Sequence, residues 1–175
     1  MARIRALHAA AILFTIALLP IQTQSQVSLG ANPAPDRRLV TAEQVEAHAR
    51  ELCASSDRTG NAARLYIAAA SLRDETDPIG AADLVLAAKL LYYSGEIESA
   101  LSTMIDGAER TELTGTTFEA AHAWINAIHL AVQLKEPTRA RAFLAAAQRL
   151  LQSPVLTDAE RRSIRGRLDV ISNDH

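Results

Sequence analysis

Two stretches of this chain determine its fold: LLYYSGEIESALSTMIDGAE (90–109) and LAVQLKEPTRARAFLAAAQR (130–149). Each contains the end of one apolar helix, a short turn and the start of a second helix, with an alanine shortly after the turn. This alanine is Ala100 in the first stretch and Ala140 in the second, and SSDRTGNAARLYIAAASL contains a fainter copy with Ala63. The intervals between successive alanines are similar, and a period of roughly 40 residues predicts helical hairpins that repeat along the chain.

The composition also favours helices. Apolar residues make up 49% of the 175 residues, which is enough for a core, whereas aromatic residues make up only 4%. Alanine, the strongest helix former, dominates the apolar segments, and its small side chain lets helices pack closely. No segment shows the alternation of β-branched and polar residues that is typical of strands. We therefore expect an all-α chain.

Helix starts are indicated by residues that accept hydrogen bonds from the free N–H groups of a first turn. A threonine is followed three positions later by Gln or Glu at Thr41–Gln44, Thr116–Glu119 and Thr157–Glu160, and proline follows Asp77 and Glu136. Together with the spacing of apolar residues, these positions predict helices at 42–55, 60–74, 78–94, 96–111, 117–134, 137–152 and 157–171. The short connections between them predict antiparallel packing of successive helices.

The N-terminal segment, 1–25, has the pattern of a secretory signal peptide. Two arginines precede an apolar segment at 6–19, and a polar stretch follows that ends at Ser25, with small residues at the positions that a signal peptidase requires. We expect cleavage after Ser25, a flexible linker at 26–40 that is rich in proline and polar residues, and a folded domain at 41–171. An uncleaved N-terminal anchor is the alternative. In both cases we expect the folded domain to be exported, in the periplasm or secreted. If the signal peptide is cleaved, we expect no membrane span to remain.

The segment LYYSGEIESAL (91–101) resembles the central turn of the tetratricopeptide repeat, in which an aromatic helix end precedes a glycine, an acidic residue, a hydrophobic residue and a small alanine. Trp124 stands where this family has a tryptophan near the start of a first helix. The resemblance covers about 41–154 and implies three hairpins stacked as a short right-handed solenoid, with 157–171 as a capping helix. The intervals exceed the family's usual period of about 34 residues, so antiparallel hairpins without this relationship are the alternative.

The resemblance also implies a binding surface, because the first helix of each hairpin lines a concave groove in this family. The corresponding residues in the second and third hairpins are Val85, Lys89, Tyr92, Tyr93, His122, Ile125, His129 and Gln133, with Ala82 and Val132 beside them. In the weaker first hairpin they are Val45, His48 and Leu52. Trp124 is expected in the core. A groove of this kind implies a protein or peptide partner and a non-catalytic interaction module.

Other functions find little support in the sequence. The chain contains no HExxH, CxxC, GxSxG or phosphate-binding glycine loop, and the sequence predicts no cofactor, metal or catalytic residue. A formal net charge of −2 argues against general nucleic-acid binding. The alternative function is a small-ligand or metal-binding protein that uses His122 and His129. These lie about 10.5 Å apart along a helix, so a metal site would need ligands from another helix.

Three further features leave alternatives open. Arginines cluster near the C-terminus, where they could form a patch for an acidic partner or a solvated surface. The ends of a short stack leave self-association open. The single cysteine, Cys53, cannot form an internal disulfide, and the alanines and leucine around it predict that it is buried.

Overall fold

The structure is a computed structural model that describes residues 40–53 and 58–173. Within these ranges the chain is all-α, and each helix begins and ends close to its predicted bounds. The helices are α2 (Ala42–Cys53), α3 (Thr59–Ser71), α4 (Pro78–Tyr93), α5 (Ile97–Leu113), α6 (Thr117–Gln133), α7 (Pro137–Leu151) and α8 (Asp158–Asn173). The predicted signal peptide at 1–25 and nearly all of the predicted linker lie outside the described residues.

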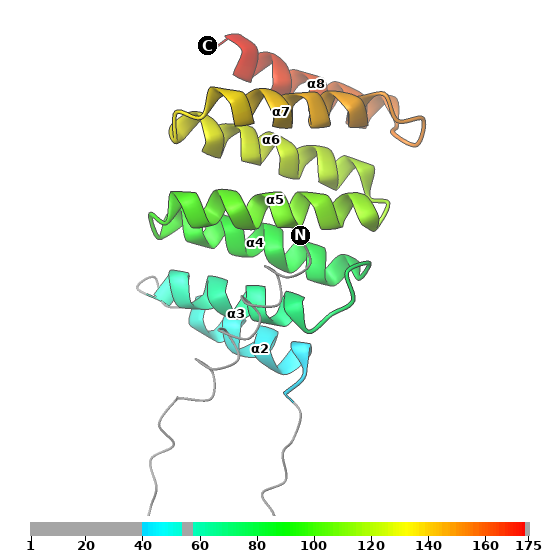
Figure 1. Ribbon diagram of the computed structural model, residues 1–175. Helices are drawn as coiled ribbons and strands as arrows, with labels where there is room; N and C mark the ends of the chain where they lie inside the picture. The colour runs from blue at the N-terminus through cyan, green and yellow to red at the C-terminus, as the bar shows by residue number, and fades with distance from the viewer. Residues whose placement is uncertain (1–39, 54–57, 174–175) are drawn as a thin grey trace, which may run out of the picture. The chain divides into compact units, whose positions relative to one another are not determined.

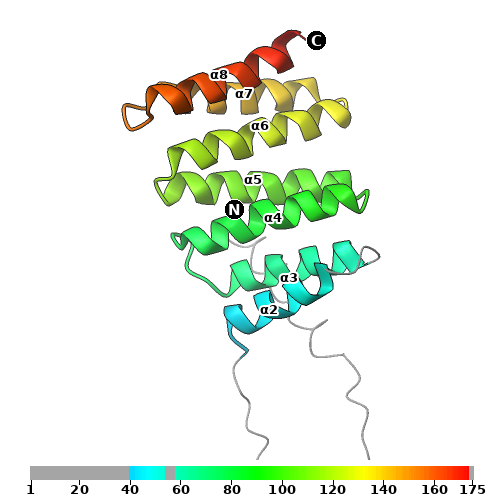
Figure 2. The same cartoon turned by 180° about the vertical axis from the view of Figure 1, so that it is seen from behind.

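The helices pack in the order in which they occur in the chain. Each one from α2 to α7 packs mainly against its neighbours in the sequence, and α8 packs on α6 and, less extensively, on α7. The expectation of antiparallel hairpins is therefore confirmed. The hairpins form two layers: α3, α5 and α7 face the viewer in Figure 1, and α2, α4 and α8 face the viewer in Figure 2.

Three tight turns set the repeat. Gly95, Gly115 and Lys135 have positive φ angles of 86°, 79° and 58°, and they are evenly spaced along the chain. After α4 and after α6 the same two hydrogen bonds close the turn, from the turn residue and from the residue that follows it to carbonyls of the last helical turn. This is the usual left-handed end of a helix. Two such intervals, from Gly95 to Lys135, make one period of the hairpin repeat. This period is longer than that of the tetratricopeptide repeat.

Two of the predicted helix starts have the expected hydrogen bonds. The Asp77 carboxylate accepts from the N–H of Ile79 at 2.8 Å, and Thr157 and Glu160 accept from each other's N–H groups, as in a capping box. The same prediction is wrong for Thr116 and for Glu136, neither of which caps a helix with its side chain. Both residues follow tight turns, and their side chains bind other partners instead of the N–H groups of the first turn. The Thr116 hydroxyl donates to the Thr111 carbonyl, and the Glu136 carboxylate pairs with Arg139.

Small residues at the helix crossings let the hairpins approach closely. Ala63, Ala100 and Ala140 are all buried, each near the start of the second helix of a hairpin. One close approach is at Gly107 of α5, where a Cβ atom would lie 3.0 Å from Cγ2 and 3.1 Å from the backbone nitrogen of Val85 in α4. A larger side chain at this position would force α4 and α5 apart.

Trp124 lies in the core, as expected, stacked on Phe143 of α7 with ring centroids 5.5 Å apart. Its indole N–H donates to the Glu112 carboxylate at 2.6 Å, and Arg149 binds the same carboxylate at 2.7 Å. The polar edge of the buried indole is therefore satisfied by α5.

Cys53, by contrast, is exposed, and the prediction that it is buried is wrong. It is the last residue of α2, where the buried stripe that runs through Ala42, Val45 and Ala49 ends.

The turn geometry predicts opposite effects for two glycine substitutions. Gly95→Ala should lower the free energy of unfolding by about 1 kcal/mol, because an L side chain is strained at positive φ, although no atom lies within 4 Å of the added methyl. Gly166→Ala, within α8 and equally free of neighbours, should raise it by up to about 1 kcal/mol. Urea unfolding followed by circular dichroism measures both, and equal effects of the same sign would contradict the assignment of the turn.

Candidate functional site

Helix α4 is apolar around nearly its whole circumference. In its sequence, PIGAADLVLAAKLLYY, only Asp83 and Lys89 carry a charge. One side packs against α3 and α5, but the opposite side is exposed, with Ile79, Leu86 and Tyr93 having 50%, 39% and 77% of their surface accessible. Ala82 and Lys89 are exposed between them. A helix that is hydrophobic all round is normally buried, so this exposed stripe is the first candidate for a binding surface.

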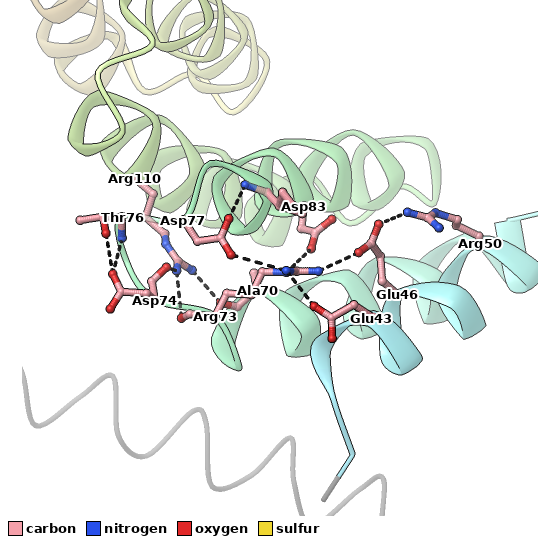
Figure 3. Close-up of polar contacts among 11 residues, drawn as sticks. Glu43, Glu46, Arg50, Ala70, Arg73, Asp74, Thr76, Asp77, Asp83 and Arg110 are labelled. Atoms are coloured by element: carbon pink, nitrogen blue, oxygen red, sulfur yellow. Dashed lines mark hydrogen bonds and ion pairs between the residues drawn. The ribbon is translucent and has the colours of Figure 1, made fainter.

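Asp83 does not reach the exposed stripe: it is buried and faces Arg73, which lies in the connection between α3 and α4 (Figure 3). The Arg73 side chain is only 8% exposed and lies among carboxylates from α2 and α4. Its Nη2 lies 2.9 Å from Glu46 and its Nη1 lies 3.2 Å from Glu43. Its Nε lies 3.8 Å from Oδ2 of Asp83. With Asp77, which lies 3.5 Å from Nη1, these residues form the Arg73 cluster, which joins α2 and α4 to the connection between α3 and α4.

The contact between Arg73 and Asp83 is an ion pair without a hydrogen bond. Arg73 Nε and Asp83 Oδ2 are both buried, and neither has a hydrogen-bond partner. Burial, and next the nearby Glu46 carboxylate, raises the pKa of Asp83 to about 6, although Arg73 acts in the opposite direction. The cluster thus positions Asp83 at a cost in free energy, since an ionised carboxylate in this place loses its hydration without full compensation.

Arg110 of α5 fixes the connection between α3 and α4. Its guanidinium donates to the carbonyls of Ala70 at 2.9 Å and Arg73 at 3.3 Å, and to those of Asp74 and Glu75 in the connection (Figure 3). These carbonyls belong to the C-terminal end of α3 and the segment after it, where cations are favoured. Arg110 therefore fixes the connection that leads into α4, next to the Arg73 cluster.

The outward side of α6 carries a different set of side chains. His122, Asn126, His129 and Gln133 follow one another at helical spacing, and all are partly or fully exposed. Arg167 of α8 donates to the Asn126 side chain at 2.9 Å and also contacts Nδ1 of His122. Because an arginine can only donate, Nδ1 of His122 accepts, and its proton is on Nε2. Burial, and then the charge of Arg167, lowers the pKa of His122, so this histidine is neutral at neutral pH.

A hydrogen bond joins the two outward stripes. The side-chain amide of Gln133 donates to the Tyr92 hydroxyl at 3.1 Å, and the Tyr92 ring lies 5.6 Å from that of Tyr93. The apolar stripe of α4 and the polar stripe of α6 are therefore linked into one surface, which we name the α4–α6 face.

Six of the eight predicted groove residues have side chains at least partly on this face: Lys89, Tyr92, Tyr93, His122, His129 and Gln133. The other two do not. Ile125 is fully buried, because α6 turns the stripe that contains it toward the core. Val85 is half-buried and packs on Gly107 of α5. Ile125 therefore offers no surface to a partner, whereas Val85 offers only part of its side chain.

The first hairpin also differs from the expectation. Val45 is buried in the core of the hairpin, so it offers no surface to a partner. His48 is exposed and pairs with Glu51 at 3.4 Å on the same helix, and Leu52 is half-buried.

Four residues of the α4–α6 face were not predicted from the sequence: Ile79, Leu86, Asn126 and Arg167. For Ile79 and Leu86 the signal was present, because α4 has too few polar residues to cover any side of a surface helix. Asn126 lies one turn after His122 and could have been found by the same spacing. Arg167 had no local signal, since only the packing of α8 on α6 brings it to His122.

The C-terminal arginines differ in their contacts. Arg139 pairs with Glu136 and Arg149 with Glu112, while Arg161 donates to the carbonyls of Leu151 and Leu156. Together with Arg167, four of the seven therefore bind within the helical domain. The remaining three, Arg141, Arg162 and Arg165, are exposed.

Within the part of the chain that the structure describes, no group of three or more His, Cys, Asp or Glu side chains is placed to hold a metal ion. At His122, Arg167 also occupies one ring nitrogen. The alternative of a metal site at His122 and His129 stays a prediction without structural support. None of the helices in the described ranges combines the length and the apolar character that crossing a membrane requires.

No family model, curated protein or solved structure matches this chain. The assignment of the α4–α6 face as a candidate site therefore rests on the arrangement of its side chains alone.

The raised pKa of Asp83 predicts a pH-dependent stability. An acid whose pKa rises on folding, here from 3.8 to about 6, contributes its full stability below about pH 4, and this contribution is lost as the pH rises through about 6. Asparagine carries no charge, so the free energy of unfolding of Asp83→Asn lacks this pH dependence. Its difference from wild type should therefore shift in favour of the variant between about pH 4 and pH 7, by on the order of 2 kcal/mol. Urea unfolding across this range measures it, with Asp169→Asn, an exposed carboxyl on α8, as the matched control. A constant difference between Asp83→Asn and wild type would contradict the prediction.

Proposed function

We propose that this chain is an exported, non-catalytic interaction module that binds a protein or peptide partner on the α4–α6 face. The observation that carries the proposal is the exposed apolar stripe of α4. Ile79, Leu86 and Tyr93 are large apolar side chains held in the open on one rigid helix. Contiguous apolar surface of this kind is typical of interaction sites, and tyrosine is enriched in them.

The spacing along α4 indicates the kind of partner. Ile79, Leu86 and Tyr93 recur at every seventh position, and Ala82 and Lys89 stand three positions after the first two. This is the repeat of a coiled-coil seam. We therefore propose an amphipathic helix of the partner that lies along α4, with its apolar side on the stripe and an acidic residue opposite Lys89.

The neighbouring helix supplies polar contacts. Asn126 and His129 lie on the outward side of α6, and Gln133 is held beside Tyr92. His122 adds a polar group that is neutral at neutral pH, because its pKa is lowered. A polar rim beside an apolar stripe is the usual anatomy of a protein interface.

The relationship to the tetratricopeptide repeat, with a right-handed solenoid, belongs to the same proposal. In support of it, α2 and α4, the first helices of the first two hairpins, lie in one layer (Figure 2). The left-handed turns recur at equivalent positions of the second and third hairpins. The longer period of each hairpin is the main departure from the family.

The apolar stripe can be tested by affinity capture. The purified chain and an Ile79→Ser, Leu86→Ser, Tyr93→Ser variant are used as baits on an envelope extract of the producing cell, and the captured proteins are quantified by mass spectrometry. We expect the variant to retain at most a tenth of the specific partner, because large apolar side chains at the centre of an interface contribute about 1 kcal/mol or more each.

A matched variant controls for the loss of exposed apolar surface. Leu113, Val155 and Val170 are also exposed but lie on α5, on the connection before α8, and on α8. Their replacement by serine should leave capture at the wild-type level. If both triple variants recover the same proteins in equal amounts as wild type, the α4–α6 face is not the binding surface. A homodimer that only the first variant dissociates would make a second copy the partner.

The export proposal has its own test. We expect the chain isolated from the periplasm or the culture medium to begin at Gln26, since a signal peptidase would cut after Ser25. N-terminal sequencing by mass spectrometry decides this. An intact N-terminus on a membrane-bound chain would support a retained anchor instead, and an intact chain found only in the cytoplasm would contradict export.

A further inference from the structure

A pocket of about 380 Å³ opens between α6, α7 and α8, next to the turn that joins α6 to α7. Its walls are aliphatic: Ile128 and Val132 come from α6, Ala140 and Leu144 from α7, and Ile171 from the last turn of α8. The pocket lies where α8 diverges from α7, which Figure 1 shows at the C-terminal end of the last helix. This volume falls in the range of small-ligand sites, about 300–1,000 Å³.

Two cations line the same pocket. Lys135 is the turn residue with φ 58°, and Arg141 follows one turn into α7. Neither side chain has an ion pair or hydrogen bond with any residue in the described ranges, although Arg139, Arg149 and Arg167 all have one. The one carboxylate in the lining, Glu136, is already paired with Arg139 at 2.7 Å. The polar part of the pocket is therefore positive, on a chain whose net charge is −2.

We propose that this pocket binds a linear aliphatic carboxylate, with the hydrocarbon chain between α6, α7 and α8 and the carboxylate at Lys135 and Arg141. The aliphatic walls favour a hydrocarbon, since burying it removes apolar surface from water on both sides. The two unpaired cations favour an anionic end, because a charge-assisted hydrogen bond is stronger than a neutral one. The site is separate from the α4–α6 face, so it does not depend on the proposed function.

Calorimetric titration of the purified chain with dodecanoate, below the concentration at which it forms micelles, tests the proposal. We expect saturable binding of one molecule per chain. Dodecanol, which lacks the charge, and dodecyltrimethylammonium, which reverses it, should each bind at least tenfold more weakly. The absence of saturable binding of dodecanoate, or equal affinity for all three probes, would overturn the proposal.

Two variants assign the binding to this pocket. Lys135→Asn with Arg141→Gln removes both cations, while asparagine tolerates the positive φ of the turn; dodecanoate should then bind at least tenfold more weakly and dodecanol unchanged. Arg162→Gln with Arg165→Gln, which removes two exposed cations of α8 outside the pocket, should leave both affinities at the wild-type level. If the two double variants weaken dodecanoate binding equally, general charge attraction explains it and the proposal fails.

Filling the pocket gives an independent result. Leu144→Trp should abolish dodecanoate binding while the helical content measured by circular dichroism stays at the wild-type level. If this variant does not fold, the double variant of Lys135 and Arg141 still decides the question. Light scattering of the unliganded chain completes the test: a dimer that Leu144→Trp dissociates would mean that a second copy occupies the pocket, and this would overturn the proposal.

Discussion

The ion pair between Arg73 and Asp83 is the interaction on which the candidate site depends. Asp83 is the only acidic residue of α4, and the Arg73 cluster holds it between α2 and the connection from α3 to α4. If this carboxylate were outside, the exposed stripe of α4 would carry an acid and would not be apolar. The buried pair has imperfect hydrogen bonding, so it contributes little net stability. Its effect is instead to set which side of α4 faces the solvent.

Close packing and regular turns then place α4 beside the helix that completes the surface. Gly107 lets α5 approach the backbone of α4, and the evenly spaced left-handed turns reverse the chain after α4, α5 and α6. Because two turns separate α4 from α6, both run in the same direction and present their outward stripes on one side. The hydrogen bond between Tyr92 and Gln133 is a direct consequence.

Helix α8 takes part in both proposed surfaces. Near its middle, Arg167 binds His122 and Asn126 at the edge of the α4–α6 face. At its end, Ile171 forms one wall of the aliphatic pocket. The divergence of α8 from α7 leaves room for this pocket between the three helices. The C-terminal end of α8 thus borders the pocket that we propose binds a small molecule.

Much of the fold was determined by the sequence alone, because the responsible forces act over a few residues. Apolar spacing, Asp77 before Pro78, and the alanines after each turn predicted every described helix and the hairpin arrangement. Of the eight predicted groove residues, six have side chains at least partly exposed on the α4–α6 face. Only the tertiary structure decided whether individual side chains are buried or exposed and which residues they contact. Ile125 is buried and Cys53 is exposed, and Asp83 faces Arg73. Arg167 reaches His122 from a distant part of the sequence. Each of these outcomes depends on which neighbouring helix covers a side chain. Residues close in the sequence do not determine that contact.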